Sequence, residues 1–394
     1  MQRYIGTRSI GIRTPIVKEG DDLVKIVSES IKNAVETHNL ELHDRDVITV
    51  TESLVARTQG NYATIDQIAK DINNKFDSDT IAILFPILSR NRFSVLLRAF
   101  AKSGKKLIIC LSYPQDEVGN SLMDEEVLYD SGINPYTDVL DLEGYRKLVG
   151  SSYKHEFTGV DYVEFYQQIA PNSEVYFFND ARKVLDYTDE ILVSSIHTRN
   201  KYKRQLKDAG AKVVLGLDEI LNSSVDGSGF NPDYGLLGTN LSTEGKVKLF
   251  PRDGQKFVDA LQEKLISMFN KNIEVMIYGD GAFKDPIGKI WELADPVVSP
   301  AYTKGLVGTP NEIKIKYVAD NELGNLSSEE LQEKMKEKIR EKDDDLKGQD
   351  DTLGTTPRAL TDLLGSLSDL TSGSGDKGTP VILIQGYFDN YSDN

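Results

Sequence analysis

A short apolar run that stops at a glycine-flanked aspartate constrains the fold of this chain more than any other feature. Residues 273–278 have the length and composition of a buried strand, and the run ends at Gly279-Asp280-Gly281. Because glycine adds no side chain, a carboxylate held between two glycines can approach a metal ion or a phosphate closely. The alternative is a plain turn in which Asp280 hydrogen-bonds its own backbone. In both interpretations Asp280 lies at the tip of a buried strand.

The middle of the chain has a different pattern. Apolar segments at residues 106–111, 174–178, 191–196 and 211–217 alternate with helical stretches such as 202–209. This alternation predicts an α/β unit with a mainly parallel sheet over residues 80–234. The unit contains no Gly-x-Gly-x-x-Gly or Walker pattern, so we assign no nucleotide site to it. A basic cluster at residues 197–204 is either a solvated helix face or an anion site.

The N-terminal part predicts a helix followed by a strand. Apolar residues from Leu23 onward follow helical spacing, and Asp21 or Asp22 can cap this helix. A strand is expected at residues 47–51, and Ser53 and Arg57 follow it directly. Small hydroxyls and a planar guanidinium after a strand can hold a phosphate. The alternative is a strand-to-helix turn with a solvated arginine.

The C-terminal half predicts strands at residues 246–250, 312–318 and 381–384, and helices at 255–269 and 358–370. The polar stretch 325–356 has a capping box at Ser327 and Glu330, and a helix follows it. This stretch is either a solvated arm or mobile lid, or an acidic metal-binding cluster. The Ser-Gly-Ser-Gly segment at 372–375 can wrap backbone amides round a phosphate or act as a flexible connection.

Composition excludes some classes of function. The formal charge of −16 over 394 residues repels nucleic acid and anionic membrane surfaces. A single cysteine, Cys110, leaves no internal disulfide, which favours a reducing compartment. The N-terminus has no apolar signal region, and no apolar run approaches the length of a membrane span. We therefore expect a cytoplasmic protein with no nucleic-acid or membrane partner.

Taken together, several segments resemble the coenzyme F-420:gamma-glutamyl ligase family. The matching segments occur in the family's order and cover roughly half of the chain: residues 15–23, 47–60, 244–251, 273–281, 316–320 and 371–383. Residues 80–234 and 325–356 have no counterpart and look like insertions. The resemblance implies an α/β fold with an α+β ligase core of mixed sheets at residues 1–79 and 235–394. An inserted α/β domain would then occupy 80–234, and a charged helical arm or lid 325–356.

The resemblance also implies an activity. Members of this family use GTP or ATP and a divalent metal, usually Mg²⁺ or Mn²⁺, to activate a carboxylate as an acyl phosphate. The amine of L-glutamate then displaces phosphate and forms an amide. Metal ions must neutralise the phosphates, and hard cations prefer oxygen ligands. The expected partners are therefore a nucleoside triphosphate, glutamate or another amino acid, and a carboxylate acceptor.

The resemblance assigns roles to particular residues. Asp280 matches the family's metal-binding aspartate, and Asp280 and Arg57 are the expected catalytic pair. Gly281 falls where the family has a hydroxyl residue that helps the metal, and Asn240 lies nearest the family's other metal aspartate. Those two departures leave the metal site either depleted or completed by Asp253, Asp285 or the inserted region. The residues that match the nucleotide-binding positions are Thr14, Pro15, Ile16, Ser53, Arg57, Ser372, Gly373, Ser374 and Gly375.

Two other functions fit the same sequence. One is a degenerate ligase-like protein that binds a metabolite or partner without turnover, because Gly281 and Asn240 depart from the family pattern. The other is a two-domain scaffold whose α/β unit at 80–234 binds a protein partner. A homodimer is expected by analogy with the family.

Overall fold

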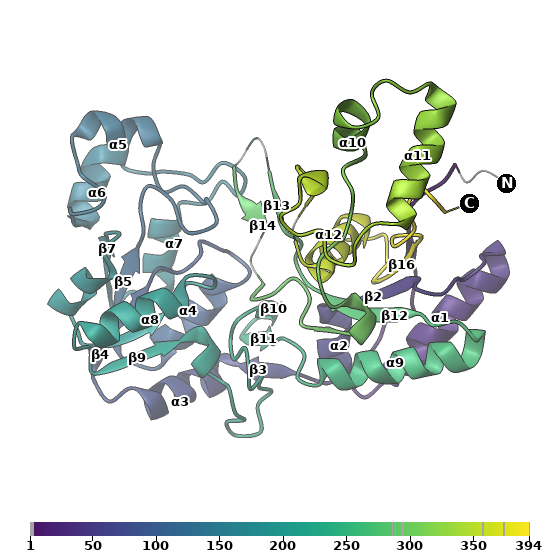
Figure 1. The fold of residues 1–394 in the computed structure, drawn as a ribbon. Helices are drawn as coiled ribbons and strands as arrows, with labels where there is room; N and C mark the ends of the chain where they lie inside the picture. The colour runs from purple at the N-terminus through teal and green to yellow at the C-terminus, as the bar shows by residue number, and fades with distance from the viewer. Residues whose placement is uncertain are drawn as a thin grey trace.

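The computed structural model describes residues 4–285, 287, 289–292, 295–356, 358–372 and 375–393. Over these residues the strands form a five-stranded sheet and a six-stranded sheet, together with a three-stranded and a two-stranded one. Figure 1 shows the two large sheets in separate lobes joined by β3, β10 and β11. The predicted α/β fold class is confirmed. None of the helices in this part of the chain combines the length and apolar composition needed to span a membrane.

The first lobe is built on what we call the core sheet, in the order β1-β16-β2-β12-β15. Its strands are β1 (Arg8–Ile12), β2 (Val47–Thr51), β12 (Glu274–Tyr278), β15 (Ala301–Tyr302) and β16 (Val381–Gln385). Helices α1 (Leu23–His38) and α9 (Gly254–Phe269) cover one face, and α12 (Leu360–Ser372) covers the other. Side chains of a strand alternate between the two faces of its sheet. The central strands β2 and β12, which are almost entirely buried, therefore supply apolar residues to both layers.

The second lobe is built on what we call the parallel sheet, in the order β6-β7-β5-β4-β8-β9. Its strands are β4 (Thr80–Leu84), β5 (Lys106–Leu111), β6 (Leu140–Asp141), β7 (Ser173–Phe177), β8 (Glu190–Val193) and β9 (Val213–Gly216). All neighbours pair in parallel except the edge strand β6. The mainly parallel sheet predicted for this region is therefore confirmed, while its status as an inserted domain stays a prediction.

The helices of the second lobe lie on both faces of the parallel sheet. α3 (Ile65–Lys75), α4 (Phe93–Lys102), α6 (Leu142–Val149) and α7 (Tyr162–Ile169) belong to one apolar cluster. α8 (Arg199–Asp208) and η1 (Ala181–Asp186) belong to the cluster on the opposite face. α5 (Glu125–Ser131) packs on α6, and η2 (Leu217–Glu219) follows β9. The spatial order β7-β5-β4-β8-β9 is that of a doubly wound sheet, with the change of direction between β4 and β8.

Short elements connect the lobes. β3 (Tyr62–Thr64) follows α2 (Glu52–Thr58) and pairs with β11 (Lys246–Lys248), which in turn pairs with β10 (Asn240–Thr243). The hairpin of β13 (Phe283–Lys284) and β14 (Trp291–Glu292) reaches the second lobe, where Trp291 N donates to Val118 O over 2.7 Å. Leu241 N likewise donates to Asn91 O over 2.9 Å. Backbone hydrogen bonds thus hold the two lobes together beside the strand tip at Asp280.

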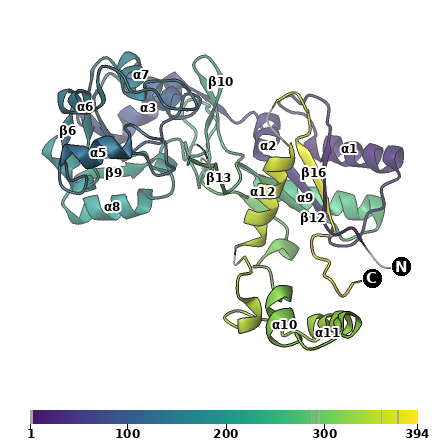
Figure 2. The same cartoon turned by 90° about the horizontal axis from the view of Figure 1, so that it is seen from above.

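The strand predicted at residues 312–318 is wrong, because helix α10 (Ile315–Asn321) occupies most of that segment. Val318 of α10 packs against Met335 and Ile339 of α11 (Ser328–Arg340), so helix packing overrides the local alternation of apolar and polar residues. The predicted capping box is confirmed, since the Glu330 carboxylate accepts from Ser327 N over 3.1 Å. Figure 2 shows α10 and α11 side by side, away from the parallel sheet. The remaining short helices are η3 (Lys304–Leu306) and η4 (Asp350–Thr352).

Candidate functional site

The topology of the core sheet brings four separate segments to one edge. β2 and β12 are parallel neighbours with Thr51 opposite Tyr278, so the residues that follow both strands leave the sheet side by side. β16 runs antiparallel to β2 and begins at this edge, where Pro380 O accepts from Thr51 N over 3.0 Å. β1 runs antiparallel to β16 and ends there. Residues near 14, 53, 280 and 375 therefore converge although they are far apart in the sequence.

A cavity of about 700 Å³, which we call the core cavity, lies at this edge. It brings together nine of the residues singled out in the sequence: Thr14, Pro15, Ile16, Ser53, Arg57, Asn240, Asp280, Ser372 and Gly375. Gly281 lies beside the cavity rather than in its wall, and its N–H donates to Asp369 Oδ2 over 3.0 Å. Gly373 and Ser374 lie outside the described residues.

Arg57 is held at the cavity by one end of its guanidinium. Its Nε donates to Val17 O over 2.8 Å, and the rest of the exposed side chain contributes to the cavity wall. An arginine fixed through Nε still presents the remaining N–H donors of its planar fork. Since Ser53 on the same helix lines the same cavity, the pair offers a cation and a hydroxyl to an anionic ligand.

Tyr278 also lines the core cavity. Its side chain is buried, and its hydroxyl oxygen has no hydrogen-bond partner among the described residues. The hydroxyls of Ser372 and Thr51 lie close enough to lower its pKa, against the rise that burial causes. Burial raises the pKa of Tyr278 to about 12, so the group is a donor at neutral pH. Buried polar groups without partners are rare, so this hydroxyl needs a specific explanation.

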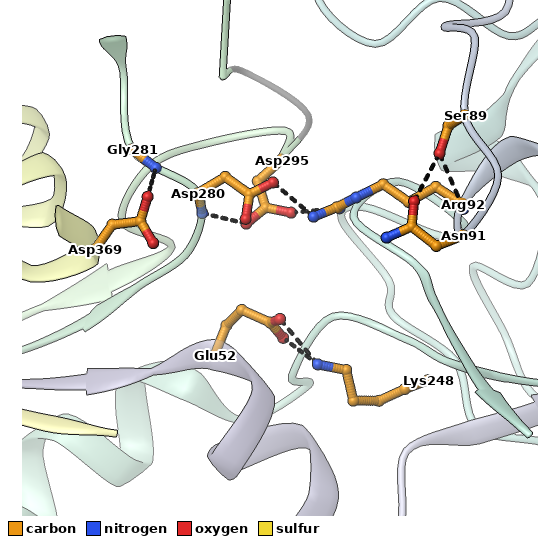
Figure 3. Close-up of polar contacts among 9 residues, drawn as sticks. All are labelled: Glu52, Ser89, Asn91, Arg92, Lys248, Asp280, Gly281, Asp295 and Asp369. Carbon is orange, nitrogen blue, oxygen red and sulfur yellow. Dashed lines mark hydrogen bonds and ion pairs between the residues drawn. The ribbon is translucent and has the colours of Figure 1, made fainter. Parts of the chain in front are cut away.

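The Asp280 carboxylate is paired with an arginine from the other lobe. Arg92 donates from Nη2 to Asp280 over 2.6 Å and from Nη1 to Asp295 over 2.9 Å (Figure 3). Asp280 N donates to Asp295 Oδ2 over 2.6 Å, which fixes the turn after β12. Burial works to lower the pKa of Arg92, but the charges of Asp295 and Asp280 overcome it and raise that pKa above its ordinary value. Asp280 is thus held in place by the second lobe.

A buried ion pair closes another side of the core cavity. Lys248 Nζ donates to the two carboxylate oxygens of Glu52 over 2.9 and 3.1 Å, and both side chains are buried (Figure 3). Burial raises the pKa of Glu52, and the positive charge of Lys248 opposes that rise. Sequence reasoning missed this pair and Arg92. The only local signal for Glu52 was its position directly after a buried strand, beside Ser53.

A second cavity, of about 650 Å³, lies where the carboxyl ends of the parallel strands meet the segment before β10 and the β13–β14 hairpin. We call it the sheet-edge cavity. Asp280 lines both cavities, and Arg92 lines this one. The buried Asp116 carboxylate organises one wall by accepting from Leu88 N over 2.8 Å, Val118 N over 3.0 Å and Asn120 N over 2.9 Å.

The Asp116 carboxyl should make the stability of the protein depend on pH. Burial raises its pKa from 3.8 to about 6 despite those hydrogen bonds. The folded state therefore holds this proton more tightly than the unfolded state, and stability is lost as pH rises from about 4 to 6, by up to about 3 kcal/mol. Urea unfolding at pH 4.5 and 6.5 should show a smaller pH difference in Asp116→Asn than in the native chain. Exposed Asp130, changed to Asn, is the control, and equal pH differences in all three proteins would contradict the assignment.

Taken together, an acidic strand tip, a fixed guanidinium, a buried hydroxyl and a buried ion pair around one cavity are typical of a small-molecule binding or active site in an α/β protein. The sequence profile of the F420-0:gamma-glutamyl ligase family matches residues 11–386. The chain therefore belongs to this family of ligases. No individual curated protein matches the chain.

Proposed function

We propose that this protein is a nucleotide- and divalent-metal-dependent amide ligase that joins L-glutamate, or another amino acid, to a carboxylate through an acyl phosphate. The observation that carries the proposal is the convergence of Arg57, Ser53 and Asp280 on one cavity with the unpartnered hydroxyl of Tyr278. A triphosphate requires cations and fixed hydrogen-bond donors in one place, because phosphoryl transfer depends on positioning and electrostatics.

The nucleotide GTP or ATP would occupy the core cavity. Arg57 and Ser53 face the phosphates, and the backbone of Thr14, Pro15 and Ile16 borders the same cavity. Gly375 contributes from the loop after α12. The Tyr278 O–H donates a hydrogen bond to an oxygen of the ligand and thereby gains the partner it otherwise lacks. A cavity of about 700 Å³ is within the range of small-molecule sites.

The residues present suit Mg²⁺ or Mn²⁺ bound together with the nucleotide. Among the described residues no three His, Cys, Asp or Glu side chains lie close enough to hold a metal by themselves. Mg²⁺ usually takes one or two carboxylates and completes its shell with waters and substrate phosphates. Asp280 supplies such a carboxylate and Asn240 an amide oxygen in the same cavity. When bound, the metal would neutralise phosphate charge.

The reaction balances with these groups. A carboxylate oxygen of the acceptor attacks the γ-phosphorus, the bond from that phosphorus to the β–γ bridging oxygen breaks, and a nucleoside diphosphate leaves. The glutamate amine then attacks the acyl carbon, the C–O bond to phosphate breaks, and the nitrogen loses a proton to solvent. Arg57 and Ser53 hold the phosphates in position, and the buried Glu52–Lys248 pair keeps water from one side of the cavity.

Thermal unfolding tests the site before any acceptor is known. GTP or ATP with Mg²⁺, at about 100 times Kd, should stabilise the native chain by about 2.7 kcal/mol and raise Tm. The Asp280→Asn variant should lose most of this Tm shift, because it lacks the carboxylate that faces the metal. Asp259→Asn, at an exposed position of α9, should keep the shift. An Asp280→Asn protein with an unchanged shift would remove Asp280 from the site.

The degenerate binding protein is the second candidate, and it is favoured by the amide at Asn240 and the missing side chain at Gly281. Mass spectrometry of cell extract incubated with triphosphate and labelled glutamate separates the two functions, because only a ligase forms a labelled adduct. The homodimer and the cytoplasmic location stay predictions.

A further inference from the structure

The sheet-edge cavity occupies the place where doubly wound sheets bind ligands. β4 and β8 are neighbours, and the helices that follow them, α4 and α8, pack on opposite faces of the sheet. The loops after these two strands therefore diverge and leave a crevice at their carboxyl ends. Ile87 to Phe93 after β4, Ser194 and Ile196 after β8, and Leu217 after β9 line the cavity. The cavity thus lies at the place where open α/β sheets commonly bind ligands.

The crevice is not built for a phosphate. The Glu117 carboxylate accepts from Ile196 N over 2.5 Å and from Thr198 N over 3.0 Å, so the start of α8 already holds an anion of the protein itself. At the start of α4, Ser89 Oγ accepts from Arg92 N over 3.1 Å. Both helix N-termini that would bind phosphate in a nucleotide-binding sheet are thus occupied by the chain's own groups.

The walls instead suit a compact apolar or aromatic body. About half of the lining side chains are apolar, among them Ile87, Leu88, Phe93, Phe157, Leu237 and Trp291. The polar group His155 is already engaged, since its Nε2 lies 3.0 Å from Asn120 Oδ1 and its Nδ1 lies 3.3 Å from the Thr158 hydroxyl. Arg90 is exposed, lines the cavity and makes no ion pair with any described carboxylate. The same wall holds the carboxylates of Asp280, which Arg92 pairs with, and Asp285. Among the described lining residues, Arg90 is therefore the cation left to face an organic anion.

The two cavities adjoin at a single residue. Asp280 belongs to the walls of both, and Arg92 binds Asp280 from the sheet-edge side while balancing the charges of Asp280 and Asp295. A molecule in the sheet-edge cavity can therefore lie next to Asp280, the strand tip where a γ-phosphate is proposed to lie. Two substrates that react with one another must occupy such adjoining sites.

We propose that the sheet-edge cavity binds the carboxylic acid that the ligase activates. The acid has a compact apolar or aromatic body without phosphate groups, Arg90 attracts its negative charge, and its carboxylate lies at the Asp280 end of the cavity. This inference rests on the proposed function for its reaction, but the cavity binds the acid whether or not a nucleotide is present. The parallel sheet thus carries the specificity for the acceptor, and the core sheet carries the nucleotide.

Three simple acids serve as probes: 3-phenylpropanoate, indole-3-acetate and decanoate, with 3-phenylpropanamide as the uncharged control. If each non-hydrogen atom contributes the binding free energy usual for drug-sized ligands, these probes should have a Kd on the order of 1 mM. Titration followed by NMR should show saturable binding of at least one acid and weaker binding of the amide. Arg90→Met and Phe157→Ser, both at exposed positions, should weaken acid binding at least about five-fold, as expected from losing one charged contact or one aromatic wall. Arg98→Met, on the exposed side of α4, should not.

The nucleotide-induced Tm shift separates this inference from the proposed function. If acid binding depends on Arg90 and Phe157 while nucleotide gives no shift, the acid site stands and the ligase proposal fails. If nucleotide shifts Tm but acid binding is unchanged in both variants, or none of the acids binds saturably, the acid site is wrong and the ligase proposal stands. Displacement of the acid by nucleotide alone would place it in the core cavity and also overturn the inference.

Discussion

Replacing Lys248 with methionine should lower the free energy of unfolding by about 3–5 kcal/mol at pH 7. Lys248 Nζ lies 2.9 and 3.1 Å from the carboxylate oxygens of Glu52, and neither side chain has appreciable access to water. Methionine matches the lysine stem in length but leaves a buried carboxylate without its counter-charge. Breaking a buried pair by removing one partner costs far more than an exposed salt bridge contributes. Urea unfolding measures the change.

The pH dependence identifies the cause of that loss. Burial already raises the pKa of Glu52, and without Lys248 it should rise further. In Lys248→Met the folded state then binds the Glu52 proton more tightly than the unfolded state, whose pKa is near the ordinary 4.5. The added destabilisation should therefore be small near pH 4 and grow as pH rises through the raised pKa. A loss of equal size at pH 4 and pH 7 would show that packing, not charge, is responsible.

Two further variants serve as controls for Lys248. Lys246→Met changes a lysine on the same strand that is only half-buried and lies over the ring of Tyr62, so it should cost no more than about 1 kcal/mol. The double variant Glu52→Leu with Lys248→Met removes both charges and should recover most of the lost stability, because an apolar pair needs no compensation. A double variant as unstable as the single one would contradict the ion-pair explanation.

The sequence was sufficient to predict the strands that carry the site but not the pairs that complete it. β2 and β12 were predictable because apolar runs of their length end in glycine or hydroxyl residues, and the order of such segments indicated the family. Once both strands exist, their parallel pairing brings Ser53 and Asp280 to one edge without further assumptions. This local information explains why nine of the residues singled out in the sequence share one cavity.

The missed residues are those whose role depends on distant parts of the chain. Glu52 and Lys248 are 196 positions apart, and Arg92 and Asp280 are 188 apart. Nothing in the local sequence near Arg92 distinguishes it from Arg90, two positions earlier, which makes no ion pair with the described carboxylates. Helix α10 was missed for a related reason, because the apolar side chains between positions 312 and 318 pack on α11 rather than on a sheet. Charge pairing and helix contacts between remote segments become visible only in the fold.

Replacing Arg57 with methionine should raise the Kd for a fluorescent mant-GTP or mant-ATP, in the presence of Mg²⁺, about 10–100-fold. Hydrogen bonds to a charged partner contribute about 1.5–3 kcal/mol, which corresponds to that range. The Arg57 side chain is exposed at the core cavity, and it makes one hydrogen bond to the backbone, from Nε to Val17 O. The change should therefore leave the free energy of unfolding in urea almost unaltered. Fluorescence titration measures the affinity of each nucleotide.

Arg57→Lys decides whether charge or geometry holds the phosphates. Lysine keeps the positive charge but cannot offer two parallel donors or the Nε bond to Val17 O, so its Kd should lie between those of the native chain and Arg57→Met. Arg8→Met, at an exposed position of β1 outside the cavity wall, should bind nucleotide as the native chain does. If Arg57→Met binds as tightly as Arg8→Met, the guanidinium does not contact the nucleotide. The phosphates would then depend on the Tyr278 and Ser53 hydroxyls and on the cation at Asp280, so Arg57 would only tie α2 to the N-terminal segment through Val17.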